Sequence, residues 1–256
     1  MLTLHSDRCI RCGLCVKTCP MGLFSRGEEG TVTLREAPCL DCFHCTAACP
    51  AGAITHSELG TAAFADDAGD SSTAARLRRR RSIRHFGNEV PSREVLQAAL
   101  DGAAYAPSAK NRRAYRWTVV LGQDAVNRLY RATLDYAAGE PNLRHLVWLD
   151  RRGYNPVTCG APCLLLVHAP IDPATASHAT DAVIAMTLAE QLLNEAGLGT
   201  CWGGYFRRAA DKSPALRELL SIPADHEIHG VLMVGRSEEH FARIPYRAPA
   251  QVNWVE

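Results

Sequence analysis

Two rows of cysteines carry the densest chemistry in this 256-residue sequence. The first row reads CIRCGLCVKTCP at residues 9–20, and the second reads CLDCFHCTAACP at residues 39–50. Each follows the spacing C-x2-C-x2-C-x3-C-P, which brings three thiolates together in one loop and places the fourth at the next element. This spacing is typical of iron–sulfur ligands and predicts two [4Fe–4S] clusters. The eight candidate metal ligands are Cys9, Cys12, Cys15, Cys19, Cys39, Cys42, Cys45 and Cys49.

Zinc is the alternative metal, because C-x2-C pairs also form tetrahedral zinc sites. Zinc sites need neither a third cysteine at the same spacing nor the trailing Cys-Pro, so the spacing favours clusters. Residues 1–57 resemble a bacterial two-cluster ferredoxin over their whole length. The resemblance implies that the fourth cysteine of each row ligates the cluster of the other row, which gives Cys9, Cys12, Cys15 with Cys49, and Cys39, Cys42, Cys45 with Cys19. We expect His44 at the surface and not as a ligand, because the thiolates complete the count.

A basic run, RLRRRRSIRHF at residues 76–86, holds six arginines in nine positions. Guanidinium forks beside a serine hydroxyl suit a phosphate dianion. A solvated basic surface or a nucleic-acid patch fits the run, taken alone, equally well.

Five segments in order resemble the FMN-dependent nitroreductase family, and the similarity covers residues 76–249. They read RRSIRHF (80–86), APSAKNRRAYRW (106–117), NEAGLGTCWGG (194–204), LLSIPADHEIHGVLMVG (219–235) and RIPYRAP (243–249). In this family FMN typically lies at the interface of a homodimer. The resemblance therefore implies that this chain binds FMN and forms a homodimer. It also implies that the FMN phosphate is held by Arg80, Ser82, Arg84 and Arg247, with Arg81 adjacent.

The same resemblance assigns further cofactor-binding residues. Pro107 would shape a turn from which Ser108 and Asn111 contact the flavin ring system or the ribityl chain. Gly203 and Gly204 would approach the flavin edge, where a backbone N–H can bond to the reactive N5. Without the resemblance, Ser108 and Asn111 are ordinary turn residues after a proline, and GLGTCWGG is a helix terminator. No catalytic side chain is expected, because the cofactor carries the chemistry.

Two features depart from the family pattern or remain outside it. Where the family commonly has Gln-Pro-Trp, this chain has Arg113-Ala114-Tyr115, and that arginine either favours an anionic group or points to solvent. The remaining cysteines, at 159, 163 and 201, lack ligand spacing and are interpreted as small buried apolar residues.

Apolar periodicity predicts the elements that position these groups. Short strands are expected at 2–5, 31–34 and 51–55, and longer ones at 115–122, 163–169 and 228–235. Helices are expected at 92–106, 124–138, 179–197 and 213–220, the third of them apolar on most sides. The fold class is α+β, with a small ferredoxin-like two-cluster domain followed by a nitroreductase-like three-layer α/β/α domain. The expected boundaries are 1–57 for the first domain, 58–75 for a flexible linker and 76–256 for the FMN-binding domain.

Composition narrows the possible partners and compartment. A net charge of +1 gives no reason to expect nucleic acid as a partner, and no apolar run is long enough for a membrane span. The start of the chain lacks a signal-peptide pattern, so we expect a cytoplasmic protein with reduced cysteines.

These features together predict an iron–sulfur flavoprotein oxidoreductase. Electrons would enter through the clusters from a ferredoxin-like protein, or from NAD(P)H at the flavin. They would leave to a small electron-poor acceptor, such as a nitroaromatic, a quinone or an enone. An electron-transfer or redox-sensing protein without small-molecule turnover is the alternative, and a nucleic-acid binder using the basic run is a further rival.

Overall fold

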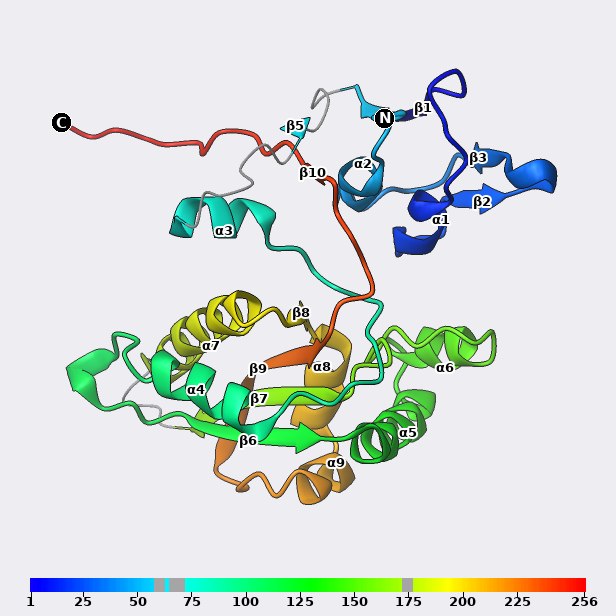
Figure 1. The fold of residues 1–256 in the computed structure, drawn as a ribbon. Coiled ribbons are helices and arrows are strands. Elements are labelled where there is room, and N and C mark those ends of the chain that lie inside the picture. Colours follow the sequence, from blue (N-terminus) through cyan, green and yellow to red (C-terminus); the bar gives the residue numbers. More distant parts are fainter. Residues whose placement is uncertain (58–62, 65–71, 172–176) are drawn as a thin grey trace. The chain divides into compact units, whose positions relative to one another are not determined.

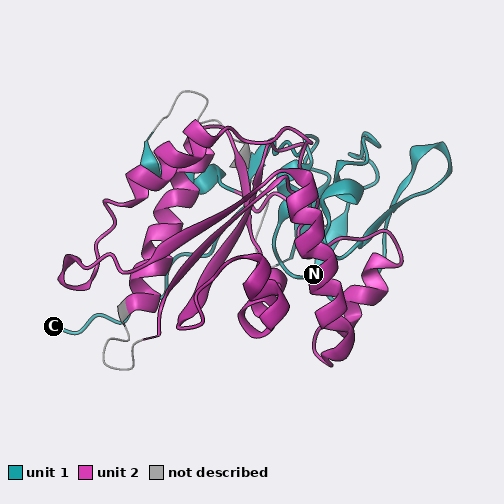
Figure 2. Ribbon diagram, turned by 90° about the horizontal axis from the view of Figure 1, so that it is seen from below, with its two compact units in different colours: residues 1–80, 239–256 teal, residues 81–238 magenta. Residues whose placement is uncertain are grey.

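The computed structural model of the chain describes residues 1–57, 63–64, 72–171 and 177–256. The chain divides into two compact units, shown in different colours in Figure 2. The first unit consists of residues 1–80 and 239–256, and the second of residues 81–238. The first unit is therefore made from both ends of the chain, whereas the second is one continuous stretch.

The first unit repeats one structural pattern around its two cysteine rows. Helices α1 (Leu14–Thr18) and α2 (His44–Ala48) begin one residue before the third cysteine of their rows, and each is followed by the fourth cysteine. The residues before them, Gly13 and Phe43, both have left-handed backbone, with φ of 77° and 60°. The strands are β1 (Leu2–Leu4), β2 (Phe24–Arg26), β3 (Val32–Leu34), β4 (Ile54–His56), β5 (Ala63–Phe64) and β10 (Arg243–Ile244). They form antiparallel pairs β1–β4, β2–β3 and β5–β10, which confirms the three short strands expected near the cysteines.

The predicted linker at 58–75 lies largely outside the described residues. The last residues of the predicted linker are helical and form the start of α3 (Thr73–Arg79). The Ser72 side chain caps this helix by accepting a hydrogen bond from the backbone N–H of Ala75 at 3.3 Å. Much of the arginine run therefore lies on a capped helix. The sequence did not predict this helix, because a run of like charges has no apolar period.

The second unit is a three-layer α/β/α domain, as predicted (Figure 1). Its antiparallel sheet has the order β6-β7-β9-β8. Helices α4 and α7 pack together over one face, and α5, α8 and α9 contact one another at the other face. The bounds are α4 (Arg93–Ala103), β6 (Arg116–Leu121), α5 (Gln123–Gly139), α6 (Arg144–Asp150), β7 (Cys163–Pro170), α7 (Ser177–Glu195), β8 (Gly199–Trp202), α8 (Gly204–Lys212), α9 (Pro214–Leu219) and β9 (His226–Gly235).

The central layer explains the apolar sequences. Strand β7 is buried along nearly its whole length, and α7 places small residues such as Ala182, Ala185 and Ala189 against it. Small side chains let a helix approach a sheet closely, so this face of α7 lies in the core of the domain. The expected burial holds for that face only, because Val183 and Leu188 on α7 are exposed. Along the described part of the chain, no helix has the length and apolar character needed to span a membrane.

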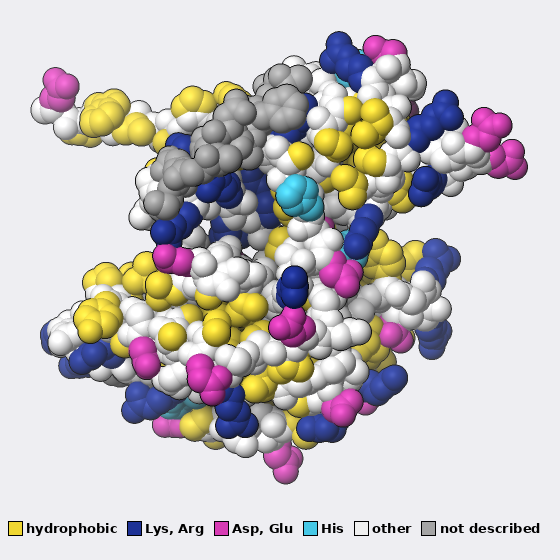
Figure 3. Space-filling view, in the orientation of Figure 1, with side chains coloured by type: hydrophobic (Ala, Val, Ile, Leu, Met, Phe, Trp, Pro, Cys, Tyr) yellow, Lys and Arg dark blue, Asp and Glu magenta, His cyan; other side chains and the backbone are white. Residues whose placement is uncertain are grey.

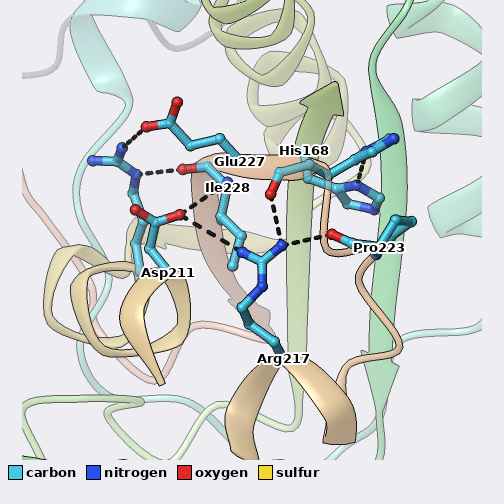
Figure 4. A network of polar contacts seen from close by, with 8 residues as sticks. His168, Asp211, Arg217, Pro223, Glu227 and Ile228 are labelled. Atoms are coloured by element: carbon cyan, nitrogen blue, oxygen red, sulfur yellow. Dashed lines mark hydrogen bonds and ion pairs between the residues drawn. The ribbon is translucent and has the colours of Figure 1, made fainter. Parts of the chain in front are cut away.

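A polar network fastens α8 and α9 to the start of β9 (Figure 4). Arg217 of α9 donates hydrogen bonds to the carbonyl oxygens of Pro223 and His226, each at 2.6 Å. Asp211 of α8 accepts a bond from the backbone N–H of Ile228 at 3.2 Å, and its carboxylate lies 4.0 Å from the Arg217 guanidinium. These bonds satisfy polar groups at the start of β9, where periodicity alone predicts only the helix and the strand.

Candidate functional site

The eight cysteines of the two rows surround two separate hollows in the first unit. The Cys49 hollow is partly open to solvent and is lined by Cys9, Cys12, Cys15 and Cys49. The Cys19 hollow is also partly open and is lined by Cys39, Cys42, Cys45 and Cys19. Each hollow thus combines three cysteines of one row with the fourth of the other, which is the crossed grouping that the ferredoxin resemblance implies.

Backbone N–H groups point at the sulfur atoms in equivalent places of the two rows. Leu23 N–H donates to Cys19 Sγ at 3.4 Å, and Ala53 N–H donates to Cys49 Sγ at 3.3 Å. In both rows the donor lies four residues after the fourth cysteine. Such donors stabilise negative charge on sulfur, so they are suited to thiolates that hold a metal cluster.

Burial makes these thiols hard to ionise on their own. Desolvation, with a further contribution from Cys49, raises the pKa of Cys15 to about 11. Desolvation also raises the pKa of Cys45, and the neighbouring Cys42 and Cys19 thiols raise it further. Thiolates at these buried positions therefore need a cationic group beside them, and iron would supply that charge.

The spacing of the sulfur atoms bears on the choice between zinc and a cluster. A single zinc ion requires its sulfur ligands to meet about 2.3 Å from one point. Among the residues that the structure describes, no three His, Cys, Asp or Glu side chains gather closely enough to hold a single ion. The preference for a cluster over zinc therefore rests on the row spacing C-x2-C-x2-C-x3-C-P, whose third cysteine and trailing Cys-Pro a zinc site does not need.

His44 is not at the surface, and that prediction was wrong. Its side chain is buried, and its ring contacts Phe241 edge-on, with centroids 5.4 Å apart. All five residues of α2 are buried, because the helix packs against α1 and is also in contact with the C-terminal segment. Sequence spacing within the row says nothing of that segment, which is why burial was missed.

In the second unit, Ser82, which is predicted to bind the FMN phosphate, lies beside β8. Ser82 forms a parallel bridge with Thr200, and Ile83 N–H donates to Thr200 O at 2.8 Å. Gly199 faces Ile83 so closely that an added Cβ would lie 2.8 Å from Ile83 Cγ1. The segment therefore extends the sheet at the edge that leads to Gly203 and Gly204.

The five residues predicted to lie at the FMN phosphate are divided between the two units. Arg81, Ser82 and Arg84 belong to the second unit, and Arg80 and Arg247 belong to the first. Arg84 Nη1 lies 3.4 Å from the carbonyl oxygen of Ser82. The guanidinium of Arg247 lies 5.6 Å from the centroid of the Phe43 ring. Their joint role at a phosphate remains a prediction.

The segment that contains Pro107, Ser108 and Asn111 forms a tight turn with strained backbone. Lys110 and Asn111 both have φ of 53°, and Arg113 has φ of 44°. Ser108 Oγ accepts a hydrogen bond from Arg113 N–H at 3.2 Å, and Arg113 itself is exposed. Left-handed backbone at non-glycine residues costs energy and persists where surrounding contacts impose it.

One such contact comes from Asp181 of α7. Both of its carboxylate oxygens lie 3.1 Å from the backbone N–H of Ala109, and the side chain is buried. The sequence offered a signal for this residue, since Asp181 is an acidic residue near the start of a helix otherwise expected to be buried.

The two glycines expected near the flavin differ in what their N–H groups do. Gly203 N–H already donates to Val231 O at 2.8 Å. Gly204 is the first residue of α8, where helical geometry provides no acceptor, and a Cβ added there would meet nothing within 4 Å. Gly204 is therefore the better placed of the two to donate to a ligand.

A buried glutamate of α7 fixes the residues before these glycines. Glu190 Oε1 accepts from Thr200 Oγ1 at 2.9 Å, and Glu190 Oε2 accepts from Trp202 Nε1 at 3.1 Å. The stretch interpreted as a helix terminator is thus a strand, β8, that an internal carboxylate holds in place. Glu190 was missed because its partners lie in a stretch not predicted to be a strand.

Comparisons with known proteins agree with this geometry. The chain matches the family model "Nitroreductase family" over residues 77–236 and the model "4Fe-4S dicluster domain" over residues 8–53. A curated protein of Archaeoglobus fulgidus, named provisionally as an NADH dehydrogenase/NAD(P)H nitroreductase, is 28% identical over 61% of this chain and 80% of its own length.

Solved structures show the same fold. A nitroreductase with bound FMN from Desulfitobacterium hafniense is 26% identical, with a TM-score of 0.59, over 72% of this chain and 97% of that one. A nitroreductase with bound FMN from Bacteroides fragilis has a TM-score of 0.60 at 22% identity, over 72% of this chain and 98% of that one.

Proposed function

This chain belongs to the nitroreductase family of oxidoreductases and carries an iron–sulfur domain before its family domain, and from these two facts we propose that it passes electrons between two [4Fe–4S] clusters and FMN. One observation carries the proposal. Two four-cysteine hollows lie in the same chain as a domain whose fold is that of FMN-containing nitroreductases. When bound, the clusters would carry electrons singly, and FMN would accept one or two and pass them on.

Cluster binding would use the cysteines already grouped by the fold. Cys9, Cys12, Cys15 and Cys49 would hold one cluster, and Cys39, Cys42, Cys45 and Cys19 the other. The N–H donors at Leu23 and Ala53 would stabilise the negative charge of the clusters.

FMN binding would use the β8 edge and the strained turn of the second unit. Ser82 and Arg84, with Arg81, and with Arg80 and Arg247 from the first unit, would bind the phosphate. Pro107, Ser108 and Asn111 would position the ring system or ribityl chain, and Gly203 would allow close approach. Gly204 N–H is the group we assign to the flavin edge. We assign no side chain as a proton donor or nucleophile.

The proposed donors and acceptors suit the chemistry of an iron–sulfur domain joined to a nitroreductase-family domain. We propose that electrons enter from a ferredoxin-like protein or from NAD(P)H, and leave to a nitroaromatic, quinone or enone. A homodimer is part of the proposal, because the family typically places FMN between subunits.

The first experiment is an anaerobic cofactor analysis followed by an activity assay. We expect about eight irons and one FMN per chain, with bleaching of the cluster and flavin absorbance on dithionite addition. The reduced protein should then be reoxidised by the acceptor panel, and NADH, NADPH and reduced ferredoxin should be compared as donors. Zinc in place of iron, or iron without FMN, would contradict the proposal.

The same assay separates the alternative functions. A redox sensor or simple electron carrier would bind the cofactors but would not be reoxidised by any small acceptor. A nucleic-acid binder would show salt-sensitive binding that FMN does not displace. On the face of the second unit seen in Figure 3, acidic and basic side chains are interspersed, which favours neither a nucleic-acid surface nor a single charged patch.

A further inference from the structure

The C-terminal segment, residues 239–247, is a structural part of the cysteine-containing unit. Thr18 Oγ1 donates to Glu239 Oε1 at 2.7 Å, and Phe241 contacts the buried ring of His44. Strand β10 then pairs with β5. The segment therefore contacts both cysteine rows, although it comes from the opposite end of the sequence.

Arg243 of this segment binds the main chain of a candidate cluster ligand. Its Nε donates to Cys49 O at 3.0 Å, and its Nη2 donates to Pro50 O at 3.2 Å. Gly52 leaves the space for this guanidinium, since an added Cβ would lie 2.9 Å from Arg243 Nη2. An arginine stays protonated in proteins, so a permanent positive charge is fixed beside the Cys49 hollow.

Arg247 brings a second positive charge to the other hollow. Its guanidinium lies 5.6 Å from the ring centroid of Phe43, a residue that lines the Cys19 hollow. This distance is within the range of a cation–π contact. Arg247 is exposed, whereas Arg243 is partly buried, so solvent screens Arg247 more.

We propose that the C-terminal segment sets the cluster potentials, and that Arg243 has the main effect. Its positive charge raises the reduction potential of the cluster held by Cys9, Cys12, Cys15 and Cys49. This inference rests on the proposed cluster binding. Reduction adds one electron to the cluster, and no proton or ligand is exchanged in the step. A fixed positive charge stabilises the more negative reduced state, so the potential rises.

The first cysteine row contains a natural comparison for Arg243. In the equivalent turn, Cys19-Pro20-Met21-Gly22, the guanidinium of Arg35 donates to Met21 O and to Gly22 O, each at 3.1 Å. Arg35 is exposed and comes from beside β3, whereas Arg243 is partly buried and comes from the far end of the chain. Both turns carry an arginine on their carbonyl groups, but solvent screens Arg35 more strongly.

The test is a potentiometric titration of the full-length holoprotein, monitored by EPR. Proton NMR of the shifted cysteine methylene signals assigns each potential to its ligands. We expect Arg243→Gln to lower the potential of the Cys49 cluster by about 59 mV, a tenfold change in electron occupancy. Arg243→Lys should keep most of the potential, and Arg35→Gln should shift the other cluster much less. Equal shifts for Arg243→Gln and Arg35→Gln, or no shift, would overturn the proposal.

A pair of glycine variants tests the same point without removing any charge. Gly52 and Gly22 have similar left-handed backbone, with φ of 62° and 56°, but nothing lies within 4 Å of a Cβ added at Gly22. Gly52→Ala should displace the guanidinium and lower the potential of the Cys49 cluster, whereas Gly22→Ala imposes the same backbone strain and should leave both potentials unchanged. If the Arg243→Gln variant fails to incorporate iron, the two glycine variants still test whether Arg243 raises the potential of the Cys49 cluster.

Failure of this inference is distinguishable from failure of the proposed function. Wild-type protein with iron and EPR signals but with potentials insensitive to Arg243→Gln and Gly52→Ala would contradict the inference alone. Wild-type protein that takes up no iron under anaerobic reconstitution would contradict both.

Discussion

At Ala109 the backbone N–H meets a buried carboxylate instead of a carbonyl. Asp181 thereby ties the strained turn of Lys110 and Asn111 to the central helix α7. A bond to a charged acceptor in a buried place is stronger than an ordinary backbone bond, so one side chain on the central helix can hold a turn whose backbone is left-handed at Lys110 and Asn111.

The first prediction concerns this carboxylate. Asp181→Ala removes the acceptor and should relax the turn, at a cost of about 1–3 kcal/mol. We expect the affinity for FMN to fall about tenfold, measured by fluorescence quenching when FMN is titrated into the apoflavoprotein. Asp101→Ala is the matched control, because Asp101 is an exposed carboxylate that accepts a bond from Gln97 on α4. Equal affinities for the two variants would contradict the role of Asp181.

His168 gives the second unit a predictable response to acid. Its side chain is buried between β6 and β9, where Thr118 Oγ1 lies 3.2 Å from Nε2 and His226 Nδ1 lies 2.8 Å from Nδ1. Desolvation, followed by His226, Arg116 and Arg217, lowers the pKa of His168 to about 4. The folded protein therefore keeps this imidazole neutral at pH values where the unfolded chain protonates it.

The second prediction follows from this difference. The free energy of unfolding should fall as the pH drops from about 6.5 towards about 4, by up to about 3 kcal/mol from His168 alone. His168→Gln should reduce the loss between pH 7.5 and pH 5.0 by about 2 kcal/mol, measured by urea unfolding. The exposed His240→Gln serves as the control and should keep the wild-type slope. Identical slopes for all three proteins would contradict the assignment.

At the scale of elements, β8 is the strand on which the arrangement of the proposed FMN-binding residues depends. Ile83 lies beside it, Glu190 of α7 fixes its side chains, and α8 begins two residues after it. Gly199 allows this arrangement, because its missing side chain lets Ile83 approach closely.

The third prediction tests that approach. Gly199→Ala should push the 81–84 segment off the strand and destabilise the fold by about 1–3 kcal/mol through overpacking. Because this segment holds the predicted phosphate ligands, the affinity for FMN should fall more than the affinity for riboflavin, which lacks the phosphate. Gly139→Ala, at the end of α5 with nothing within 4 Å of the added Cβ, should change neither affinity. Equal losses for FMN and riboflavin would contradict the placement of the phosphate.

The elements that sequence predicted well are those with a strong apolar period. The strands at β6, β7 and β9 and the helices α4, α5, α7 and α9 appear within a few residues of their expected bounds. Strand β8 was missed, because glycines and a tryptophan hide its period, and α3 was missed within a run of like charges. Asp181, Glu190 and Arg243 act on residues distant in sequence, so no local pattern could identify their partners.

At the scale of the whole molecule, the crossed grouping of the cysteines makes each cluster depend on both rows. The fourth prediction uses pairs of alanine variants and an iron count. Cys19→Ala with Cys39→Ala removes two ligands of one hollow and should leave about four irons per chain. Cys9→Ala with Cys19→Ala removes one ligand from each hollow and should leave almost none.

The reverse result would show that each row binds its own cluster. Cys163→Ala is the control, since this buried cysteine lies in β7 of the second unit and lines neither hollow. It should keep the full iron content.

The two ends of the chain meet in the first unit, and this has a consequence for how the protein matures during translation. All eight candidate ligands have been made by residue 49, but Arg243 emerges 194 residues later. At roughly 5–20 residues per second, the ribosome needs about 10–40 seconds to cover that distance. Clusters inserted into the nascent chain would first exist at a lower potential than in the finished protein. Synthesis of Arg243 would then raise the potential, at a time when the proposed FMN-binding unit, residues 81–238, has already been made.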